Sequence, residues 1–448
     1  MEFNGLKKAV EESLKFDKVV KKSYDLAAEE IYGGQETPGI ACFAYGSPGR
    51  LELIGGDSDA DVFLVEDRIT EKSRGFKRLF TKILDSFDFS KVDMPDWGSF
   101  EEIDTYLAKS MVEGNQVLET RFLTGDLGVA NQLAIKKNRF NSVERGLKNI
   151  VFNRLYFNQY FRQRVRNGSL NLKYCNGGSR DFLFVYWHDR LDRLLLQEPS
   201  DDAYKPKIEQ GLERLYKQGT ISGREFEEAI EATNFIMNIR ADILKLNKNS
   251  TDRGLTQLDD DVLKKLETLG HPPLAKSKEL FESSRKSIDL VANKVWTETM
   301  KKAELIYGQD WAESFRRAHS SRTSYDDRNS IPYDDPLMAV ALIWGASESN
   351  QKQLFDYLAD KYKSARDWSI IGSLVCSPLC SPEVLHHFGT GQLKEKGYGY
   401  LLRVVARNPN VTRDTLEAIA SDGKLEKRYT EIASAALKEG NVAANNQI

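Results

Sequence analysis

The chain has 448 residues, of which 40% are hydrophobic and 29% are charged, and its formal net charge is -3. This length predicts two or three domains, and the apolar content argues against a mainly disordered chain. The near balance of charge argues against a protein that coats nucleic acid over its whole surface, while local basic patches stay compatible with it.

Cysteine usage and hydropathy indicate the compartment. Four cysteines are scattered without a CxxC pair, which suggests neither a disulfide framework nor a cysteine-rich zinc site, and a reducing cytoplasm fits best. The N-terminal segment alternates charged and apolar residues at helical spacing, unlike a signal peptide. The longest apolar run, residues 337–344, is too short to span a bilayer. We therefore expect a cytoplasmic protein with no membrane partner.

The first part of the chain mixes strand and helix signals. Residues 40–45 (IACFAY) and 62–65 (VFLV) are short apolar runs that predict buried strands, and residues 74–85 predict a helix. Residues 89–94 (FSKVDM) predict a third strand, which ends before Pro95. We expect an α/β domain, a mixed sheet with helices, over residues 1–125.

The middle of the chain is helical in pattern. From about residue 100 to residue 320, apolar residues recur at helical spacing with few strand signals. We expect an all-α helical domain over residues 126–318. Residues 319–335 are polar and contain many turn-forming residues, which predicts a linker.

An internal repeat is predicted over residues 336–448. Leu354, Leu385 and Leu416 occupy matching places 31 residues apart, a period typical of stacked helical units. Asn350, Ser381 and Thr412 stand where helix N-caps belong. The segment ARNPNVTRDTLEAIA resembles the leucine-rich-repeat variant class of α-solenoids. With only three copies, a plain helical bundle is the alternative to this α-helical repeat.

The stretch GSPGRLELIGGDSDADVFL, residues 46–64, sets acidic residues between a glycine-rich turn and a predicted strand. Residues two apart on a strand face the same way, so Asp59 and Asp61 can present both carboxylates to one point. Such closely placed charges repel unless a cation lies among them, and magnesium prefers oxygen ligands. Paired metal ions can hold both the entering and the leaving oxygen of a phosphoryl transfer. We therefore predict two Mg2+ ions and a nucleoside triphosphate, such as ATP, at this stretch.

The turn before the acids suits a phosphate. Gly46 and Gly49 would let backbone N–H groups approach it, and Ser47 adds a hydroxyl donor. A Gly-Ser pair alone is usually a plain turn, and a DxD pair alone is usually a solvated strand end or a cap. A Gly-Ser pair followed by a DxD pair, between two apolar strands, is a far more specific signal than either pair alone.

The whole stretch resembles the nucleotidyltransferase signature of the DNA polymerase β-like superfamily, in which GS precedes a DxD by about this interval. GRLEL and SDAD are similar to the GRxEL and SDxD segments of the bacterial uridylyltransferases and adenylyltransferases of nitrogen regulation. The resemblance implies an enzyme that transfers nucleotides, with Asp59 and Asp61 as catalytic metal ligands. It also implies that Gly46, Ser47 and Arg50 lie at the nucleotide.

A third carboxylate is expected in KVDMPDW. There the resemblance implies that Asp93 coordinates metal and helps to deprotonate the acceptor hydroxyl, although a simple strand-end acid is the alternative. LETRFLTGD, residues 118–126, resembles the family's LxARxLxGD. NLKYCNGGSRDFLF, residues 171–184, resembles LKxGxGGxRDIEF.

The second of these segments has a reading of its own. Gly177-Gly178 would open a helix whose N-terminus attracts anions, so Lys173 and Arg180 are expected to bind the nucleotide. The alternative is a merely well-capped helix in which Asp181 caps the N-terminus or pairs with Arg180.

The acceptor is the least constrained part of the prediction. Residues 134–180 contain eleven Lys or Arg and one acid, which predicts a solvated helix face, a helical domain folded over a triphosphate or an RNA-binding surface. Solenoids generally present an extended surface to a protein, so we expect a protein acceptor bound through the C-terminal repeat. A tRNA-directed nucleotidyltransferase and a non-catalytic nucleotide-binding scaffold are the alternatives.

The histidines do not predict a metal centre. His188-Asp189 suggests a metal-dependent phosphohydrolase, but the further histidine clusters that this chemistry needs are absent among five histidines. We therefore expect His188 to be structural. His386-His387 has no nearby set of acidic or cysteine ligands, so zinc is not expected there.

Overall fold

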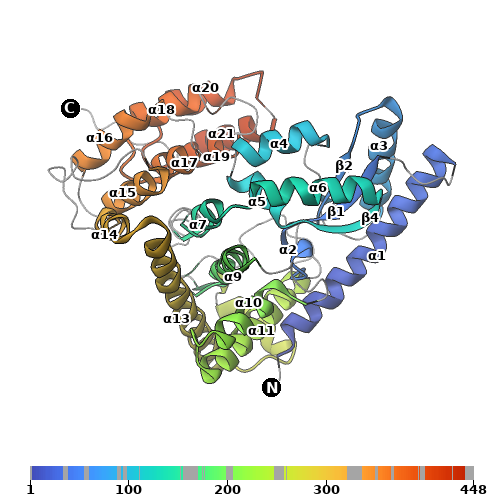
Figure 1. Ribbon diagram of the computed structural model, residues 1–448, viewed down its shortest axis with the longest axis horizontal. Helices are drawn as coiled ribbons and strands as arrows, with labels where there is room; N and C mark the ends of the chain where they lie inside the picture. Colours follow the sequence, from blue (N-terminus) through green and yellow to red (C-terminus); the bar gives the residue numbers. More distant parts are fainter. Residues whose placement is uncertain are drawn as a thin grey trace. The chain divides into compact units, whose positions relative to one another are not determined.

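Figure 1 shows the computed structural model. The structure describes residues 3–33, 39–54, 60–87, 92–93, 98–109, 111–151, 153–154, 170–173, 175, 177–197, 205–246, 257–258, 260–319, 335–348, 352–364, 368–391, 393, 399–425 and 427–438. The chain forms two compact units. The first comprises residues 1–108, 112–150 and 161–299, and the second comprises residues 109–111, 151–160 and 300–448.

The chain is helix-rich, with a small sheet in its N-terminal part. The strands are β1 (Ile40–Ala44), β2 (Ala60–Glu66), β3 (Val92–Asp93), β4 (Arg121–Gly125), β5 (Leu170–Asn171) and β6 (Gln257–Leu258). The helices up to the end of the first unit are α1 (Gly5–Tyr32), α2 (Gly46–Gly49), α3 (Glu71–Asp85), α4 (Phe100–Lys109), α5 (Met111–Leu118), α6 (Leu127–Phe140), α7 (Val143–Val151), α9 (Phe182–Leu196), α10 (Lys207–Lys217), α11 (Gly223–Leu246), α12 (Asp260–Thr268) and α13 (Leu274–Tyr307).

The main sheet is mixed and has the strand order β3-β2-β1-β4. β1 pairs antiparallel with β2, with Cys42 opposite Leu64, and antiparallel with β4 on its other side. β2 pairs in parallel with β3. The strands predicted at residues 40–45 and 62–65 are confirmed, and so is the helix at residues 74–85, which lies within α3. Of the strand predicted at residues 89–94, Val92–Asp93 lies within the described residues and forms β3.

β4 was not predicted, because the sequence from residue 100 onward was interpreted as helical. Its five residues, RFLTG, carry only one buried apolar side chain, Leu123. A short edge strand can be held by a single apolar side chain. Such a strand shows little alternation of apolar and polar residues, which is the signal that predicts a strand from sequence.

The helices α1 and α3 cover one face of the sheet (Figure 1). Phe16, Val20 and Tyr24 of α1 and Phe76 and Phe80 of α3 are buried in one cluster with sheet residues. Each such side chain contributes roughly 1.5–3 kcal/mol of burial free energy. α3 begins at a capping box, in which the side chains of Thr70 and Ser73 each accept a hydrogen bond from the other's backbone N–H. This packing fixes the sheet on which the acidic strand β2 lies.

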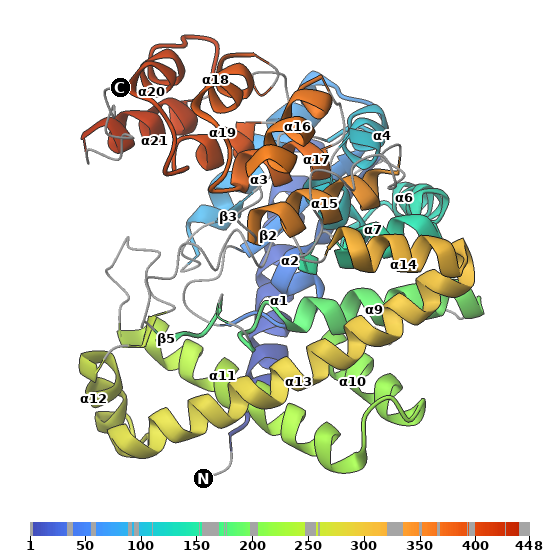
Figure 2. The same ribbon diagram turned by 90° about the vertical axis from the view of Figure 1, so that its left-hand side faces the viewer.

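The remainder of the first unit is helical. α11 and α13 cross each other in the view of Figure 2, and α12 lies between them in the chain. Lys294 of α13 pairs with Glu225 of α11, with 2.7 Å between Nζ and Oε1. α11 also reaches the N-terminal helix, because Asn234 Oδ1 accepts the backbone N–H of Leu6 at 2.9 Å. The first unit therefore contains residues of both domains predicted over 1–125 and 126–318.

The second unit holds the last part of the chain. Its helices are α14 (Gln309–Ala318), α15 (Pro336–Glu348), α16 (Lys352–Tyr362), α17 (Trp368–Cys376), α18 (Pro382–Thr390), α19 (Gly399–Val405), α20 (Arg413–Ala420) and α21 (Lys427–Lys438). α15 packs on α17, α17 on α19 and α19 on α21, while α18 packs on α20. The predicted N-caps are confirmed at Ser381 and Thr412, whose side chains accept backbone N–H groups at the starts of α18 and α20, whereas Asn350 lies outside the described residues. Most of the predicted linker, residues 320–334, lies outside the described residues.

The three leucines of the predicted repeat, Leu354, Leu385 and Leu416, are fully buried on α16, α18 and α20. Asn408 adds a contact at the same period, because its Nδ2 donates to Ser377 O, 31 residues earlier, at 2.9 Å. None of the helices in the described part of the chain has the length and apolar character to cross a membrane.

Candidate active site

The glycine-rich turn and the acidic strand touch each other. Gly46 opens α2 directly after β1 with a φ of +58°, in the left-handed region that favours glycine. A β-carbon on Gly46 would overlap Asp61 Oδ2, so the carboxyl group of Asp61 lies against the backbone of the turn. The Tyr45 N–H donates to Asp61 O at 3.0 Å, which fixes the two segments on the backbone as well.

The predicted third carboxylate lies beside the second in the sheet. The parallel pairing of β2 with β3 sets Ala60 opposite Val92 and Asp61 opposite Asp93. The register therefore brings the Asp61 and Asp93 positions together across neighbouring strands. Asp59 and the side chain of Asp93 lie outside the described part of the structure. Among the side chains that are described, no group of three His, Cys, Asp or Glu could hold a metal ion.

The second glycine of the turn faces backbone. A β-carbon on Gly49 would lie 2.7 Å from Glu119 O and 3.1 Å from Ala44 O. The turn therefore rests on the end of β1 and on the residues just before β4. Ser47 is half-buried beside it, and its carbonyl accepts the Glu52 N–H at 2.9 Å.

Arg50, predicted to lie at the nucleotide, is held by two carboxylates. Its Nε donates to Glu52 Oε2 at 2.9 Å, and its Nη1 donates to Glu119 Oε2. Burial opposes the charge of the guanidinium, but the carboxylates of Glu119 and Glu52 outweigh it and raise the pKa of Arg50. Burial also raises the pKa of the Glu119 carboxyl, and Arg50 opposes that rise. The guanidinium of Arg50 therefore joins Glu52 to Glu119 and holds the glycine-rich turn in place.

The same turn is joined to the helical part of the first unit. The Lys207 N–H donates to Arg50 O at 3.2 Å, and the Ile208 N–H donates to Glu52 Oε1 at 3.3 Å. Both donors belong to the first turn of α10, whose early N–H groups have no partner within the helix. The backbone around Arg50 and the side chain of Glu52 satisfy two of them, so α10 and the glycine-rich turn position each other.

Lys173 and Arg180 lie in a second tight turn. The Arg180 N–H donates to Lys173 O at 3.1 Å, so the backbones of the two predicted phosphate ligands are adjacent. Gly177 has a φ of +74°, and a β-carbon there would overlap the backbone carbonyl of Arg285 on α13. Asp181 is buried and accepts the Gly177 N–H at 2.6 Å. Asp181 therefore closes this turn, and its side chain makes no cap hydrogen bond at the start of α9, which was one of the two roles considered for it.

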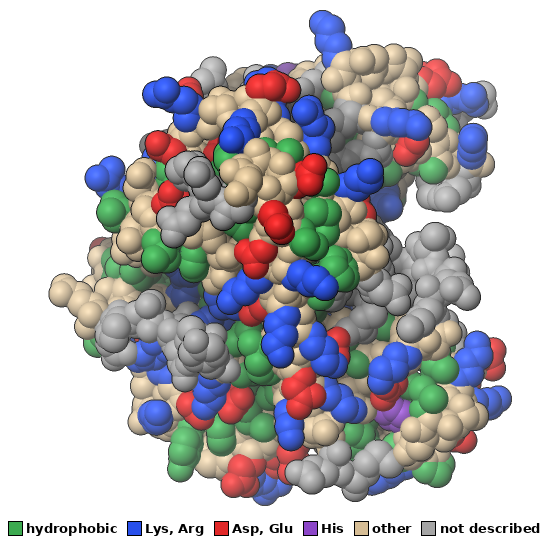
Figure 3. Space-filling view, turned by 90° about the vertical axis from the view of Figure 1, so that its right-hand side faces the viewer, with side chains coloured by type: hydrophobic (Ala, Val, Ile, Leu, Met, Phe, Trp, Pro, Cys, Tyr) green, Lys and Arg blue, Asp and Glu red, His purple; other side chains and the backbone are tan. Residues whose placement is uncertain are grey.

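The basic stretch is largely engaged where the structure describes it. Lys136 pairs with Asp104, and Lys137 donates to Thr120 O at 3.0 Å. Arg145 Nη1 donates to Leu107 O at 2.7 Å, at the carbonyl end of α4. Burial and the nearby Arg190 lower the pKa of Arg145 to about 10. On the face drawn in Figure 3, Lys and Arg side chains are interspersed with Asp and Glu side chains. Residues 155–169, with Arg162, Arg164 and Arg166, lie outside the described residues.

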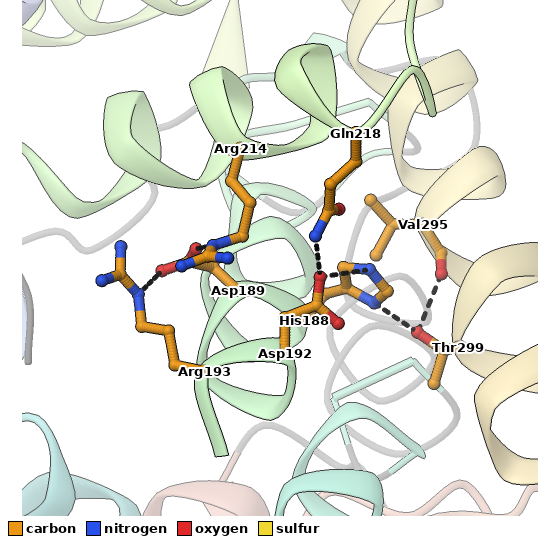
Figure 4. A network of polar contacts seen from close by, with 8 residues as sticks. All are labelled: His188, Asp189, Asp192, Arg193, Arg214, Gln218, Val295 and Thr299. Atoms are coloured by element: carbon orange, nitrogen blue, oxygen red, sulfur yellow. Dashed lines mark hydrogen bonds and ion pairs between the residues drawn. The ribbon is translucent and has the colours of Figure 1, made fainter. Parts of the chain in front are cut away.

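His188 lies in a buried polar network (Figure 4). Its Nδ1 is 3.0 Å from Thr299 Oγ1 of α13, and its Nε2 is 3.7 Å from Asp192 Oδ2. Asp192 also accepts from Gln218 Nε2 at 2.7 Å. The network joins α9 to the end of α10 and to α13, as expected for a structural histidine. The neighbouring Asp189 accepts from Arg193 and Arg214.

Several residues that position the turn were not predicted from the sequence. Glu119 and Arg121 lie in the segment that resembles LxARxLxGD, so the resemblance marked them without giving them a role. Glu52 lies in GRLEL, which resembles the family's GRxEL, so the resemblance marked it in the same way. Asp17 on α1 carried no signal, because acids on a surface-like helix are common. Their importance becomes visible only when the fold brings them to the turn.

One comparison with known proteins bears on this arrangement. The family model described as GlnD PII-uridylyltransferase matches residues 158–295, which include α9 to α12 and most of α13. No curated protein matches the chain. The matched segment follows the glycine-rich turn in sequence and contacts it through α10, as the Lys207 and Ile208 hydrogen bonds show. The match supports a nucleotidyltransferase activity in general and, for this chain, the uridylyltransferase branch of those enzymes.

Proposed function

We propose that this protein transfers a nucleoside monophosphate from a nucleoside triphosphate to a hydroxyl acceptor, most simply on a protein partner in the cytoplasm. The contact between Gly46 and Asp61 carries the proposal. It unites a turn that suits phosphate with the strand that carries the acids, as the resemblance to nucleotidyltransferases implies. The family match over residues 158–295 supports the same class of enzyme.

The proposed ligands of the triphosphate come from two turns. Gly46 and Ser47 would hold the β and γ phosphates through backbone N–H groups and a hydroxyl. Lys173 and Arg180 would add positive charge from the second turn, where their backbones are hydrogen-bonded to each other. Arg50 would act through the turn, because its guanidinium is already bound by Glu52 and Glu119.

The proposed metal is Mg2+, with two ions held by Asp59, Asp61 and Asp93. These aspartates are the kind of ligand that magnesium prefers, because it binds carboxylate oxygens. The register of the sheet places two of the aspartate positions, 61 and 93, side by side. When bound, the metal would neutralise triphosphate charge and stabilise the charge that develops on the leaving group.

The proposed step is an in-line displacement. The oxygen of the acceptor hydroxyl attacks the α-phosphorus, the bond from that phosphorus to the bridging oxygen of the β-phosphate breaks, and pyrophosphate leaves. The proton of the acceptor hydroxyl passes to a carboxylate, for which Asp93 is proposed. The products are the nucleotidylated acceptor and pyrophosphate.

A protein acceptor is favoured by the second unit. Its paired helices and the contact of Asn408 with the turn 31 residues earlier support an α-helical repeat over residues 336–448, similar to leucine-rich-repeat variant solenoids. Such stacked helices present an extended surface to a protein partner.

A direct experiment identifies the donor and the acceptor. The full-length protein is incubated with Mg2+, cell extract and each of the four nucleoside triphosphates in turn, labelled at the α-phosphate. We expect one nucleotide to label a band that protease removes and ribonuclease leaves. A band removed by ribonuclease would favour the RNA-directed alternative, for which binding should weaken steeply with salt. Nucleotide binding with no label in any band would favour the non-catalytic scaffold.

A further inference from the structure

A largely buried arginine, Arg121, links the first helix of the chain to the glycine-rich turn. Arg121, at the start of β4, makes a two-pronged ion pair with Asp17 of α1, with Nη1–Oδ2 and Nη2–Oδ1 distances of 2.8 and 2.9 Å. The same Nη2 also donates to Pro48 O at 3.0 Å, inside the turn. One guanidinium therefore connects α1, β4 and the segment that opens with Gly46.

The chemistry of this contact requires arginine. A guanidinium presents its N–H donors in a rigid planar fork, so it can bind both oxygens of a carboxylate and still donate to a carbonyl. A lysine ammonium is a compact point charge and cannot reproduce that fork. Asp17 and Arg121 are both largely buried, with 11% and 17% of their side chains exposed, so the orientation is set by packing as well.

The contact between Arg121 and Pro48 lies next to the residues that are proposed to bind phosphate. Pro48 separates Gly46 from Gly49, and Gly46 is the residue that Asp61 touches. A shift of the Pro48 carbonyl would move the backbone N–H groups proposed to hold phosphate relative to the Asp61 carboxylate. A displacement of about 1 Å between groups in an active site can cost roughly 100-fold in rate.

We infer that Arg121, oriented by Asp17, is a positioning residue for nucleotidyl transfer. It fixes the position of the glycine-rich turn relative to the Asp61 carboxylate, so that both can contact the phosphates. This inference rests on the proposed function, because it assigns Arg121 an effect on that site. Within the described residues, the guanidinium of Arg121 hydrogen-bonds to Asp17 and to the turn, and it is not placed at the reacting atoms.

The test compares two variants with a matched control in the same unit. Arg121→Lys keeps the charge and loses the fork, and Asp17→Asn keeps the shape and weakens the ion pair. The control is Arg214→Lys, which alters another arginine–aspartate pair of similar burial, between Arg214 and Asp189, with 15% and 3% of the side chains exposed. The measurements on the full chain are kcat and KM for the labelled nucleotide, and hydrogen exchange of the peptide that spans residues 43–54.

We expect Arg121→Lys to lower kcat/KM by about 10- to 100-fold, the range found when a supporting residue of a site is removed. Most of the loss should lie in kcat, and the 43–54 peptide should exchange faster. Asp17→Asn should show a smaller loss of the same kind, and Arg214→Lys should leave both quantities near wild type.

Two results would overturn the inference in distinguishable ways. If the wild type transfers nucleotide while Arg121→Lys keeps its kcat, KM and 43–54 exchange, the positioning role is wrong and the proposed function stands. If the wild type neither binds nor transfers any nucleotide, the proposed function fails and the inference fails with it.

Discussion

The carboxyl group of Asp61 lies so close to the Cα of Gly46 that residue 46 has no room for a β-carbon. Gly46 also has a φ of +58°, which a side chain disfavours. Gly46→Ala should therefore displace Asp61 and lower nucleotidyl transfer by at least about 10-fold, as expected when reacting groups are misplaced. Gly33→Ala is the matched control, because Gly33 has a φ of +74° and no atom of the described residues lies within 4 Å of its missing β-carbon. Equal activity of the two variants would show that the contact has no functional role.

The buried ion pair of Arg50 should govern the stability of the first unit. Arg50→Met leaves the carboxylates of Glu52 and Glu119 without their cation, which should destabilise the folded chain by about 3–5 kcal/mol. Adding Glu119→Gln removes one of the two charges, so the double variant should recover part of the loss. Urea unfolding measures the free energy of unfolding of the single and the double variant. The exposed pair of Arg74 with Glu71 serves as control, since Arg74→Met should change that free energy by less than about 1 kcal/mol. A double variant less stable than Arg50→Met would refute this account of the cluster.

His188 should matter for folding and not for chemistry. His188→Ala would remove the contacts of a buried ring with Asp192 and Thr299, each of which keeps another partner, so we expect a loss of roughly 0.5–3 kcal/mol. Thermal unfolding should detect this loss, while nucleotidyl transfer per folded molecule and its metal dependence should stay unchanged. A loss of activity without a loss of stability would place His188 in a catalytic or metal site after all.

The second unit offers a comparison between two asparagines. Asn408 is buried and donates to Val375 O and Ser377 O at 2.8 and 2.9 Å. Asn410 makes the same kind of contact, to Pro378 O and Cys380 O, from a more exposed position. Asn408→Ala should therefore accelerate hydrogen exchange in residues 368–391 more than Asn410→Ala does, because unsatisfied groups cost more when buried. The reverse order would contradict a repeat that is coupled through its buried asparagine.

Acid should weaken the contact between α11 and the segment before α13. Burial works against the charged form of Asp242, but hydrogen bonds from His271 and Lys245 outweigh it and lower its pKa to about 2. Because the folded pKa lies below the ordinary value of 3.8, this stabilisation is complete above about pH 4 and is lost as the pH falls toward 2. The free energy of unfolding should thus fall less steeply for Asp242→Asn than for wild type between about pH 4 and pH 2. Parallel curves would contradict the assignment.

Much of the first unit follows from local patterns. The apolar runs at residues 40–45 and 62–65 predicted β1 and β2, and the spacing of residues 74–85 predicted α3, because short-range periodicity records burial. The resemblance in GSPGR and SDAD predicted that the turn and the acids belong together, and Gly46 does contact Asp61.

The supporting residues could not be predicted in the same way. Asp17 is 104 residues from Arg121, and Arg50 is 69 residues from Glu119, so no local pattern joins either pair. Arg50 was assigned to the nucleotide because its neighbours match a family motif, whereas the fold surrounds it with carboxylates. Charged residues in a sequence do not reveal whether a ligand or another part of the chain balances them.

The central claim is that Asp61 takes part in nucleotidyl transfer at the glycine-rich turn. The most direct measurement is the rate of label transfer from the preferred nucleotide by the wild type, by Asp61→Asn and by Asp67→Asn, an exposed acid that follows the same strand. We predict that Asp61→Asn loses transfer by at least about 100-fold while it remains folded, and that Asp67→Asn keeps it, since only the first would alter a metal ligand. Full transfer by Asp61→Asn would contradict the account.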